Sequence, residues 1–181
     1  MATSIPTVTT YPINKSFLSN NKFDFVLKRI PNLTFFVQSV NLPSITLQSS
    51  TINTPAVALS IPGNQIGFSA LTVSFIVDEE MRSWYEIYNW IYQLGNPKTS
   101  NKIGTLTGQP GSDTDIYSDA TLFIKSNSNN PQWKVTFHEL YPTDLGELQF
   151  STVEGQEFIT SSVTFNYTYY EFNSITDTVE G

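Results

Sequence analysis

Alternation of apolar and polar residues with a period of two runs through most of this chain and constrains its fold more than any other feature. It is cleanest in residues 70–77, where Leu71, Val73 and Phe75 occupy every second position. In a β-strand, successive side chains point to opposite faces, so this pattern predicts strands with one buried face. Strands are predicted for residues 22–30, 34–40, 45–49, 56–61, 70–77, 116–125, 132–140 and 158–172.

Turn-forming residues between these segments indicate how they pair. Pro31-Asn32 separates the first two segments, and residues 126–131 separate the sixth and seventh, so each pair is predicted to form a hairpin. Proline at Pro43, Pro55 and Pro62 limits the two short strands and favours edge or loop positions for them. The chain is therefore predicted to be mainly β, as an antiparallel β-sandwich or barrel.

One segment has a helical period instead. From about residue 79 to 94, apolar residues recur at intervals of three and four, which predicts one amphipathic helix flanking the sheets. Asp78 is the predicted N-cap, and Glu79 and Glu80 suit the positive end of the helix dipole. Gly95 is predicted to end the helix in a left-handed conformation.

A single domain accounts for the periodic part of the chain. Residues 1–21 are polar and interrupted by proline, and are predicted to be an N-terminal arm. Residues 22–172 form the predicted β domain, within which residues 95–115 form a long loop rich in turn-forming residues. Residues 173–181 form an acidic C-terminal tail.

The composition excludes several classes of protein. The net charge is −7, which disfavours non-specific binding to the nucleic-acid backbone. There is no cysteine, so disulfides and thiolate metal sites are excluded. No apolar run approaches the ~20 residues that cross a bilayer, and the first twenty residues lack a secretory signal. Synthesis in the cytoplasm and no membrane association are therefore expected.

Charged residues are also scarce. They make up 14% of the chain, against ~25% in an average soluble protein. A surface with few charges and many Thr, Ser and Asn side chains fits a protein that is buried against copies or partners. Carbohydrate-binding sandwiches share this composition.

Residues with catalytic chemistry do not form a recognisable motif. His138 is the only histidine, and it lies on a predicted strand where an outward, partly solvated position explains it better than catalysis. Glu139, Asp144 and Glu147 could supply a pair of carboxylates, but an acidic β protein commonly offers such a trio. We expect no enzymatic activity.

Ligand-binding motifs are equally weak. Asp113-Thr-Asp115 resembles the start of a calcium loop, but the later ligands are missing. No glycine-rich phosphate loop is present. Asn32-Leu-Thr34 and Asn166-Tyr-Thr168 match the glycosylation sequon, which has no use without secretion. We expect neither a cofactor nor a metal.

Three tyrosines near the C-terminus could form a stacking platform for sugars or bases. Tyr167, Tyr169 and Tyr170 lie on one predicted strand, where Tyr167 and Tyr169 share a face and Tyr170 points the opposite way. Because a single face does not hold all three, packing in the core and at an interface explains them better.

The segment from Trp133 to Phe172 carries a family resemblance. A strand over 134–140 leads into Tyr141-Pro142-Thr143, then the run Leu145–Gln149, an acidic link at 153–157 and a strand over 159–171. This order closely resembles the last third of the tail tube protein of contractile-tailed bacteriophages. Weaker agreement upstream includes Asn21–Phe25, Asn41-Leu42-Pro43 and Phe75–Glu80.

The resemblance implies a function in assembly. The family's β-sandwich or barrel with a flanking helix forms hexameric rings that join their sheets into an inner barrel and stack into a tube. The same scaffold occurs in type VI secretion and in contractile injection particles. It implies a virion tail protein whose partners are its own copies, the tail sheath, the tape-measure protein and the baseplate and terminator proteins, with DNA passing through the lumen.

The resemblance also implies where copies meet. The predicted assembly interface is Tyr141, Pro142, Thr143, Gly146, Glu147, Leu148 and Gln149, although Gly146 equally fits a tight corner that needs glycine. The arm and the long loop are predicted to reach adjacent rings or the sheath. Candidate acids of the lumen are Asp24, Asp144, Glu147 and Glu154.

Other functions remain open at this stage. A baseplate tube initiator or a tail terminator would share the fold and would differ from the repeating subunit in copy number. A carbohydrate-binding β-sandwich would explain the aromatic residues. A hydrolase has only His138 and scattered acids to support it.

Overall fold

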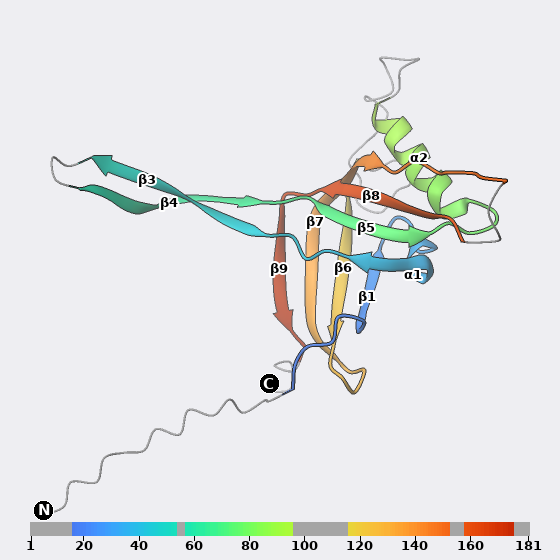
Figure 1. Cartoon of the computed structure of the whole chain (residues 1–181), viewed down its shortest axis with the longest axis horizontal. Coiled ribbons are helices and arrows are strands. Elements are labelled where there is room, and N and C mark those ends of the chain that lie inside the picture. The colour runs from blue at the N-terminus through green and yellow to red at the C-terminus, as the bar shows by residue number, and fades with distance from the viewer. Residues whose placement is uncertain (1–15, 54–56, 96–115, 153–157, 176–181) are drawn as a thin grey trace, which may run out of the picture.

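The computed structural model describes residues 16–53, 57–95, 116–152 and 158–175, and structural statements below refer to these residues. Two antiparallel sheets form the body, with a helix beside them, and a two-stranded ribbon projects from one side (Figure 1). The predicted mainly β fold with a flanking helix is confirmed. The predicted arm, long loop and tail fall largely on residues 1–15, 96–115 and 176–181, which lie outside the described residues.

Nine strands and two helices make up the described residues. In chain order they are β1 (Phe23–Leu27), α1 (Leu33–Phe36), β2 (Val37–Val40), β3 (Ile45–Asn53), β4 (Ala58–Phe68), β5 (Leu71–Ile76), α2 (Arg82–Leu94), β6 (Ser118–Lys125), β7 (Pro131–Leu145), β8 (Thr160–Asn166) and β9 (Tyr169–Ser174).

The long strand β7 belongs to both sheets of the body. Its first part lies between β6 and β9, and β1 pairs with the far side of β6, which gives the four-stranded order β1-β6-β7-β9. Its last part pairs with β8, and the order continues through β5 to β2. All these pairs are antiparallel, so the hairpin predicted around residues 126–131 is confirmed as β6–β7.

A bulge bends β7 where it passes from one sheet to the other. The register with β6 shifts between Ser118 and Ala120, and Glu139 has a positive φ of 55°. The hydroxyl of Thr168 donates to the Glu139 carboxylate at 2.5 Å across the bend. An extra residue in one strand increases its bend and twist, which aims the two halves of β7 into different sheets.

The left-handed backbone of Glu139 leads to a testable prediction. A β-branched side chain is disfavoured at positive φ, whereas glycine adopts it freely. We expect Glu139→Val to be less stable than Glu139→Gly by about 1–2 kcal/mol, measured by urea unfolding. Equal stabilities of the two variants would show that the bend in β7 does not require a left-handed backbone at position 139. Both variants lose the Thr168 contact, so the comparison isolates the backbone.

The core lies between the two sheets and α2. Its largest fully buried side chains come from both sheets and from the helix: Trp90, Phe25, Phe75, Phe137 and Phe165. The rings of Trp90 and Phe165 are 6.2 Å apart, which joins α2 to β8. Burial of these aromatic side chains, together with the aliphatic side chains of the same core, stabilises the fold.

Helix α2 begins three residues later than predicted, and its N-cap residue is Met81, so the prediction of Asp78 at that position is wrong. The Asp78 side chain nevertheless caps the first turn. The Asp78 carboxylate accepts from the backbone N–H groups of Arg82 and Ser83 at 3.1 and 3.2 Å. The predicted left-handed conformation of Gly95 is wrong, because its φ is −109°. The Gly95 N–H donates to the carbonyl of Ile91 at 3.0 Å and ends the helix without a left-handed residue.

The hairpin predicted between residues 22–30 and 34–40 is wrong. Residues Leu33–Phe36 form the short helix α1, and β1 pairs with β6 while β2 pairs with β5. The apolar run from Leu33 fits a strand or a helical turn equally well. In the helical turn, Leu33 lies fully inside the core.

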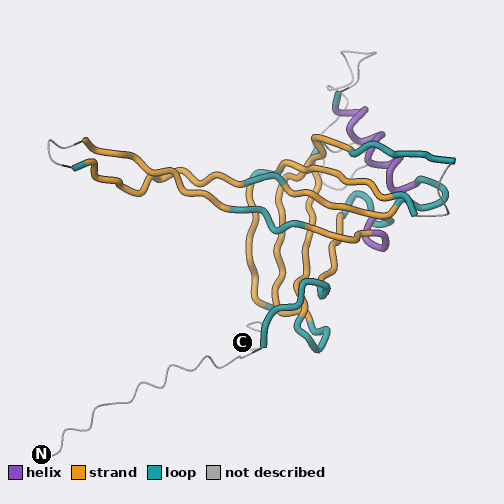
Figure 2. Tube along the Cα trace, in the orientation of Figure 1, coloured by secondary structure: helices purple, strands orange, loops and turns teal. Residues whose placement is uncertain are grey.

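The two short strands predicted at 45–49 and 56–61 are in fact one long ribbon. Strands β3 and β4 pair with each other along their lengths and with no other described strand (Figure 2). Strand β4 continues through Pro62-Gly63, where the register shifts. A Cβ at Gly63 would lie 2.5 Å from the Gln48 carbonyl oxygen, so only glycine allows this close approach.

The last predicted strand, 158–172, is interrupted. It forms β8 and β9, which both pair with β7 and are separated by Tyr167 and Thr168. The backbone N–H of Thr168 still donates to the carbonyl of His138 at 3.1 Å. The interruption between β8 and β9 lies opposite the bulge in β7, so the chain bends at the same place on both sides of the pairing.

Candidate assembly surfaces

The ribbon formed by β3 and β4 carries many of the exposed large apolar side chains among the described residues. Its outer edges are both unpaired, and the sequence holds no charged residue between Arg29 and Asp78. The exposed large apolar side chains of the ribbon, including the residue just before β4, are Ile45, Leu47, Ile52, Val57, Leu59, Ile61 and Ile66. Monomeric proteins usually protect edge strands with charges, so an uncharged ribbon indicates a surface that a partner covers.

The outer half of the ribbon has one apolar and one polar face. Ile52 lies opposite Leu59 across the two strands, whereas Thr51 lies opposite Ser60. Because successive residues point to opposite faces, these two pairs lie on different sides of the ribbon. A partner therefore meets an apolar face and leaves a hydroxyl-bearing face to solvent.

In the four-stranded sheet, β1 on one side and β9 on the other each have an outer edge that no described strand pairs with. Its outer face carries ion pairs between neighbouring strands. Lys125 contacts Asp24 at 2.5 Å and Lys28 contacts Asp119 at 2.7 Å. Burial alone would raise the pKa of the Asp119 carboxyl, but the hydrogen bond and the charge of Lys28 hold that pKa below its usual value.

His138 belongs to this outer face. Its ring stacks on Tyr169 with centroids 4.7 Å apart, and its nitrogens lie 4.0 Å from Asp119 and 3.8 Å from Glu171. The side chain is partly exposed, as predicted. These neighbours are two carboxylates and a tyrosine ring from adjacent strands, so His138 contributes to packing between strands on this face.

The predicted interface over 141–149 has a different local structure from the one expected. Tyr141 to Leu145 continue β7, so the predicted turn at Tyr141-Pro142-Thr143 is wrong. The bend occurs earlier, at Glu139. Pro142 is buried, and the Thr143 hydroxyl donates to the carbonyl of Thr164 on β8 at 3.1 Å.

Gly146 joins β8 and α2. Its N–H donates to the Ser162 carbonyl at 2.6 Å, and its own carbonyl accepts from Ser161 Oγ at 3.0 Å and from the Trp84 indole at 3.4 Å. A Cβ at Gly146 would lie 3.0 Å from the backbone of Ser162. The glycine is therefore explained by close approach within one copy.

The rest of the predicted interface is more accessible. Glu147 and Gln149 are exposed and joined by a 3.0 Å hydrogen bond, and Leu148 is half-buried. The assignment of these residues to an interface between copies stays a prediction. Asp144 is also exposed, at the end of β7.

The carboxylates considered as metal ligands do not form a metal-binding group in the part of the chain that the structure describes. Among the described residues, no group of three His, Asp or Glu side chains could hold a metal ion. Glu139 is occupied by its bond to Thr168. Asp113, Asp115 and Glu154 lie outside the described residues.

The three tyrosines divide between two faces, but not as predicted. Tyr167 and Tyr170 pack together beside Phe137, at ring distances of 5.2 and 5.7 Å from it. Tyr169 lies on the outer face with His138. The interruption between β8 and β9 changes the parity, and so Tyr167 shares a face with Tyr170. No platform of three rings results, which agrees with the packing interpretation.

Tyr167 leads to a prediction on pH. Burial, followed by the charge of the neighbouring Tyr170, raises the pKa of Tyr167 to about 12. A folded-state pKa above the unfolded value means that this group stabilises the fold below about pH 10 and that the stabilisation is lost as the pH rises toward 12. We expect a late-titrating tyrosine in ultraviolet titration that disappears in Tyr167→Phe. An unchanged titration curve in that variant would contradict the assignment.

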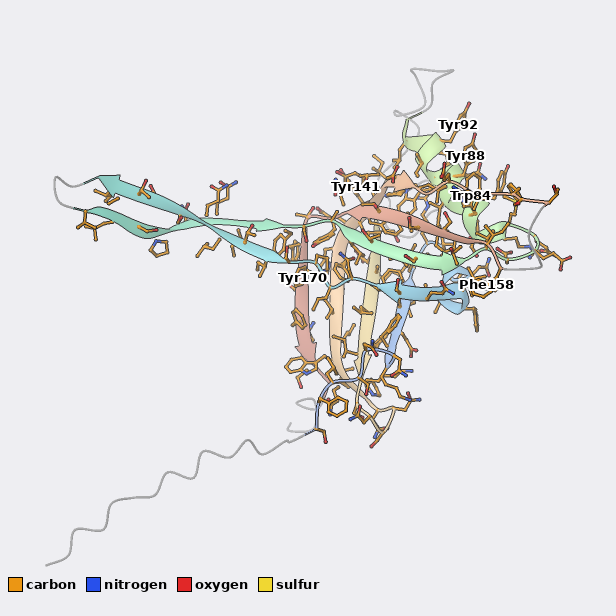
Figure 3. The ribbon with its side chains drawn as sticks, viewed as in Figure 1. Trp84, Tyr88, Tyr92, Tyr141, Phe158 and Tyr170 are labelled. Atoms are coloured by element: carbon orange, nitrogen blue, oxygen red, sulfur yellow. The ribbon has the colours of Figure 1, made fainter. Side chains whose placement is uncertain are left out.

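Sequence reasoning missed two surface features. The projecting ribbon was missed because its two halves were predicted as separate short strands, although the absence of charge from residue 30 to 77 was a usable signal. The second is a row of stacked rings along one side of α2, formed by Trp84, Tyr88 and Tyr92 (Figure 3). Their spacing of four residues places the three rings one above the other on a helix.

The sequence and the fold of this chain were compared with those of known proteins. The family model described as phage tail tube protein matches residues 4–173. The chain belongs to the phage tail tube protein family. This confirms the resemblance noted from the segment around Leu145–Gln149 and identifies the chain as a structural component of the phage tail.

Similar proteins are known from a phage tail and from two other assemblies. The chain is 29% identical over 143 residues to the tail tube terminator protein of Enterobacteria phage T4, covering 76% of this chain and 77% of that protein. Its fold resembles a chain of the PVC sheath-tube complex, an extracellular contractile injection system (TM-score 0.61, 15% identity, 96% and 100% covered). It also resembles a chain of the anti-feeding prophage tube terminating cap (TM-score 0.62, 14% identity, 93% and 99% covered).

No helix among the described residues of this family member is long and apolar enough to cross a membrane.

Proposed function

We propose that this tail tube family member forms the ring that terminates the inner tube of a contractile phage tail. The similarity to the T4 tail tube terminator, which extends over three quarters of both chains, carries the proposal. It replaces the repeating tube subunit, which the sequence alone favours, with the tail terminator, which shares the first alternative with a baseplate tube initiator. In this role the chain has no enzymatic activity.

Ring formation is supported by the two free edges of the four-stranded sheet. Strands β1, β6, β7 and β9 alternate in direction, so β9 of one copy and β1 of the next would run antiparallel to each other. Pairing of these edges satisfies backbone groups that a monomer leaves open. Because the two edges differ, the contact is head-to-tail and closes into a cyclic assembly, for which six copies is the proposed number.

In such a ring, the outer face of the four-stranded sheet would line the conduit. Two of its lysines are paired with carboxylates, in Asp24–Lys125 and Lys28–Asp119, which weakens the attraction of this face for a passing polyanion. The proposed contact partners are the last ring of the tube, the sheath protein and the terminator of the sheath. The tape-measure protein and DNA would pass through the conduit. The protein would be made in the host cytoplasm and reside in the virion tail.

A second candidate is the repeating subunit of the tube. The family description, phage tail tube protein, covers 170 of the 181 residues and favours it (4–173 inclusive). The two candidates differ in copy number and in whether rings of the chain stack on each other.

Quantitative mass spectrometry of purified virions separates the candidates. A terminator is present at one ring per tail, so its peptides should be many-fold less abundant than those of the sheath protein. Abundance equal to the sheath would overturn the terminator and favour the repeating subunit. Absence of the chain from virions would contradict both.

A further inference from the structure

The ribbon extends from two strands of the body, β2 and β5, and projects past the edge of the body. Strand β3 follows β2 after four residues, and β4 leads directly into β5. Nine residues of β3, at about 3.3 Å each, reach roughly 30 Å. A two-stranded ribbon alone is only marginally stable in water, so its apolar face requires cover from another molecule.

The opposite end of the molecule carries two highly exposed aromatic side chains. Phe35 on α1 is 89% exposed, and Phe158, which precedes β8, is 67% exposed. Both lie near the far end of β5, because Val37 pairs with Phe75 and Thr160 pairs with Ile76. Figure 3 places Phe158 at the end of the body away from the ribbon. We call Phe35 and Phe158 the far-end aromatics.

The ribbon lies beside the β9 edge of the four-stranded sheet, and the far-end aromatics lie on the side of the β1 edge. The base of the ribbon adjoins β9, since the Phe68 ring packs 5.1 Å from Tyr170 and the Tyr170 hydroxyl donates to the Pro43 carbonyl. The far-end helix α1 instead packs on β1. Figure 1 shows β9 on the ribbon side of the sheet and β1 on the α1 side.

We propose that the apolar face of the ribbon of one copy lies across the far-end aromatics of the next copy in the ring. The inference rests on the proposed ring and names a contact within it. One displacement that brings β9 to β1 of the neighbour also brings the ribbon toward α1 of that neighbour. The ribbon and Phe35 both belong to the uncharged stretch of the chain, so no ribbon charge is buried.

The absence of cysteine allows a direct test by cross-linking. One chain carries Leu59→Cys or Ile61→Cys on the apolar face of the ribbon, and a second carries Phe35→Cys or Phe158→Cys. The two are mixed, assembled and treated with a short bis-maleimide. At least one of the four combinations should give a heterodimer band at least ten-fold stronger than the same ribbon variant mixed with Thr136→Cys, on the outer face of the four-stranded sheet.

Charge substitution gives an independent readout. Leu59→Lys should abolish ring formation by the folded monomer, whereas Ser60→Lys, on the polar face of the same strand, should leave it unchanged. Equal effects of both substitutions would overturn the contact. Rings seen by electron microscopy without any of the four cross-links would overturn it and leave the terminator proposal intact. No rings from the unmodified chain would remove both.

Discussion

Replacing Trp90 with alanine should reduce the free energy of unfolding by about 3–5 kcal/mol, a large part of the stability of a domain of this size. Trp90 is fully buried, packs on Phe165 of β8, and its indole N–H donates to the Ile116 carbonyl at 3.3 Å. The Arg29 guanidinium lies 4.7 Å from its ring centroid. Truncation leaves a cavity between α2 and the sheet and removes all three contacts.

The matched control for Trp90 is Tyr88→Ala, two residues earlier on the same helix. Tyr88 is partly exposed and stacks only on neighbouring rings of α2, so its loss should cost about 1 kcal/mol. Urea unfolding at low protein concentration separates this effect from assembly. Similar losses for both variants would show that α2 does not share the core.

Replacing Gly146 with valine should be similarly damaging. A Cβ at this position meets the Ser162 backbone at 3.0 Å, so the link between β7 and β8 must open. Overpacking of this kind costs about 1–3 kcal/mol, and displacement of the Gly146 carbonyl also removes its bonds to Ser161 and Trp84.

The control for Gly146 is Gly95→Ala. A Cβ at Gly95 meets only the Ile91 carbonyl at an ordinary 3.6 Å, and its φ is negative, so alanine should be tolerated. Thermal unfolding should show a lower Tm for Gly146→Val and little change for Gly95→Ala. A stable Gly146→Val monomer that fails to form rings would instead place the glycine at the interface between copies.

Periodicity predicted the elements whose side chains face one buried surface. Strand β5, the β6–β7 hairpin and helix α2 follow because Val73, Val135 and Ile87 recur at the period of their element and are fully buried. The family was predictable because the run Leu145–Gln149 combines a close backbone approach at Gly146 with a fixed place before the terminal strand.

Features decided by contacts between distant residues were not predictable from local patterns. The helical turn at Leu33–Phe36 depends on the core pocket that receives Leu33. The bend in β7 depends on a left-handed backbone conformation at Glu139, and glutamate has no preference for that conformation that would predict it from the sequence. The ribbon hides its continuity at Pro62-Gly63, where proline and glycine resemble a strand end. The division of the tyrosines between faces follows from the interruption at Tyr167.

Electron microscopy of the purified chain mixed with preassembled tail tubes tests whether the chain terminates the tube. A terminator should form isolated rings on its own, and the mixed tubes should carry one such ring at one end and no longer elongate. Long tubes formed by the chain alone, or continued elongation of the mixed tubes, would contradict a terminator. A chain that stays monomeric under all conditions would contradict membership of any ring.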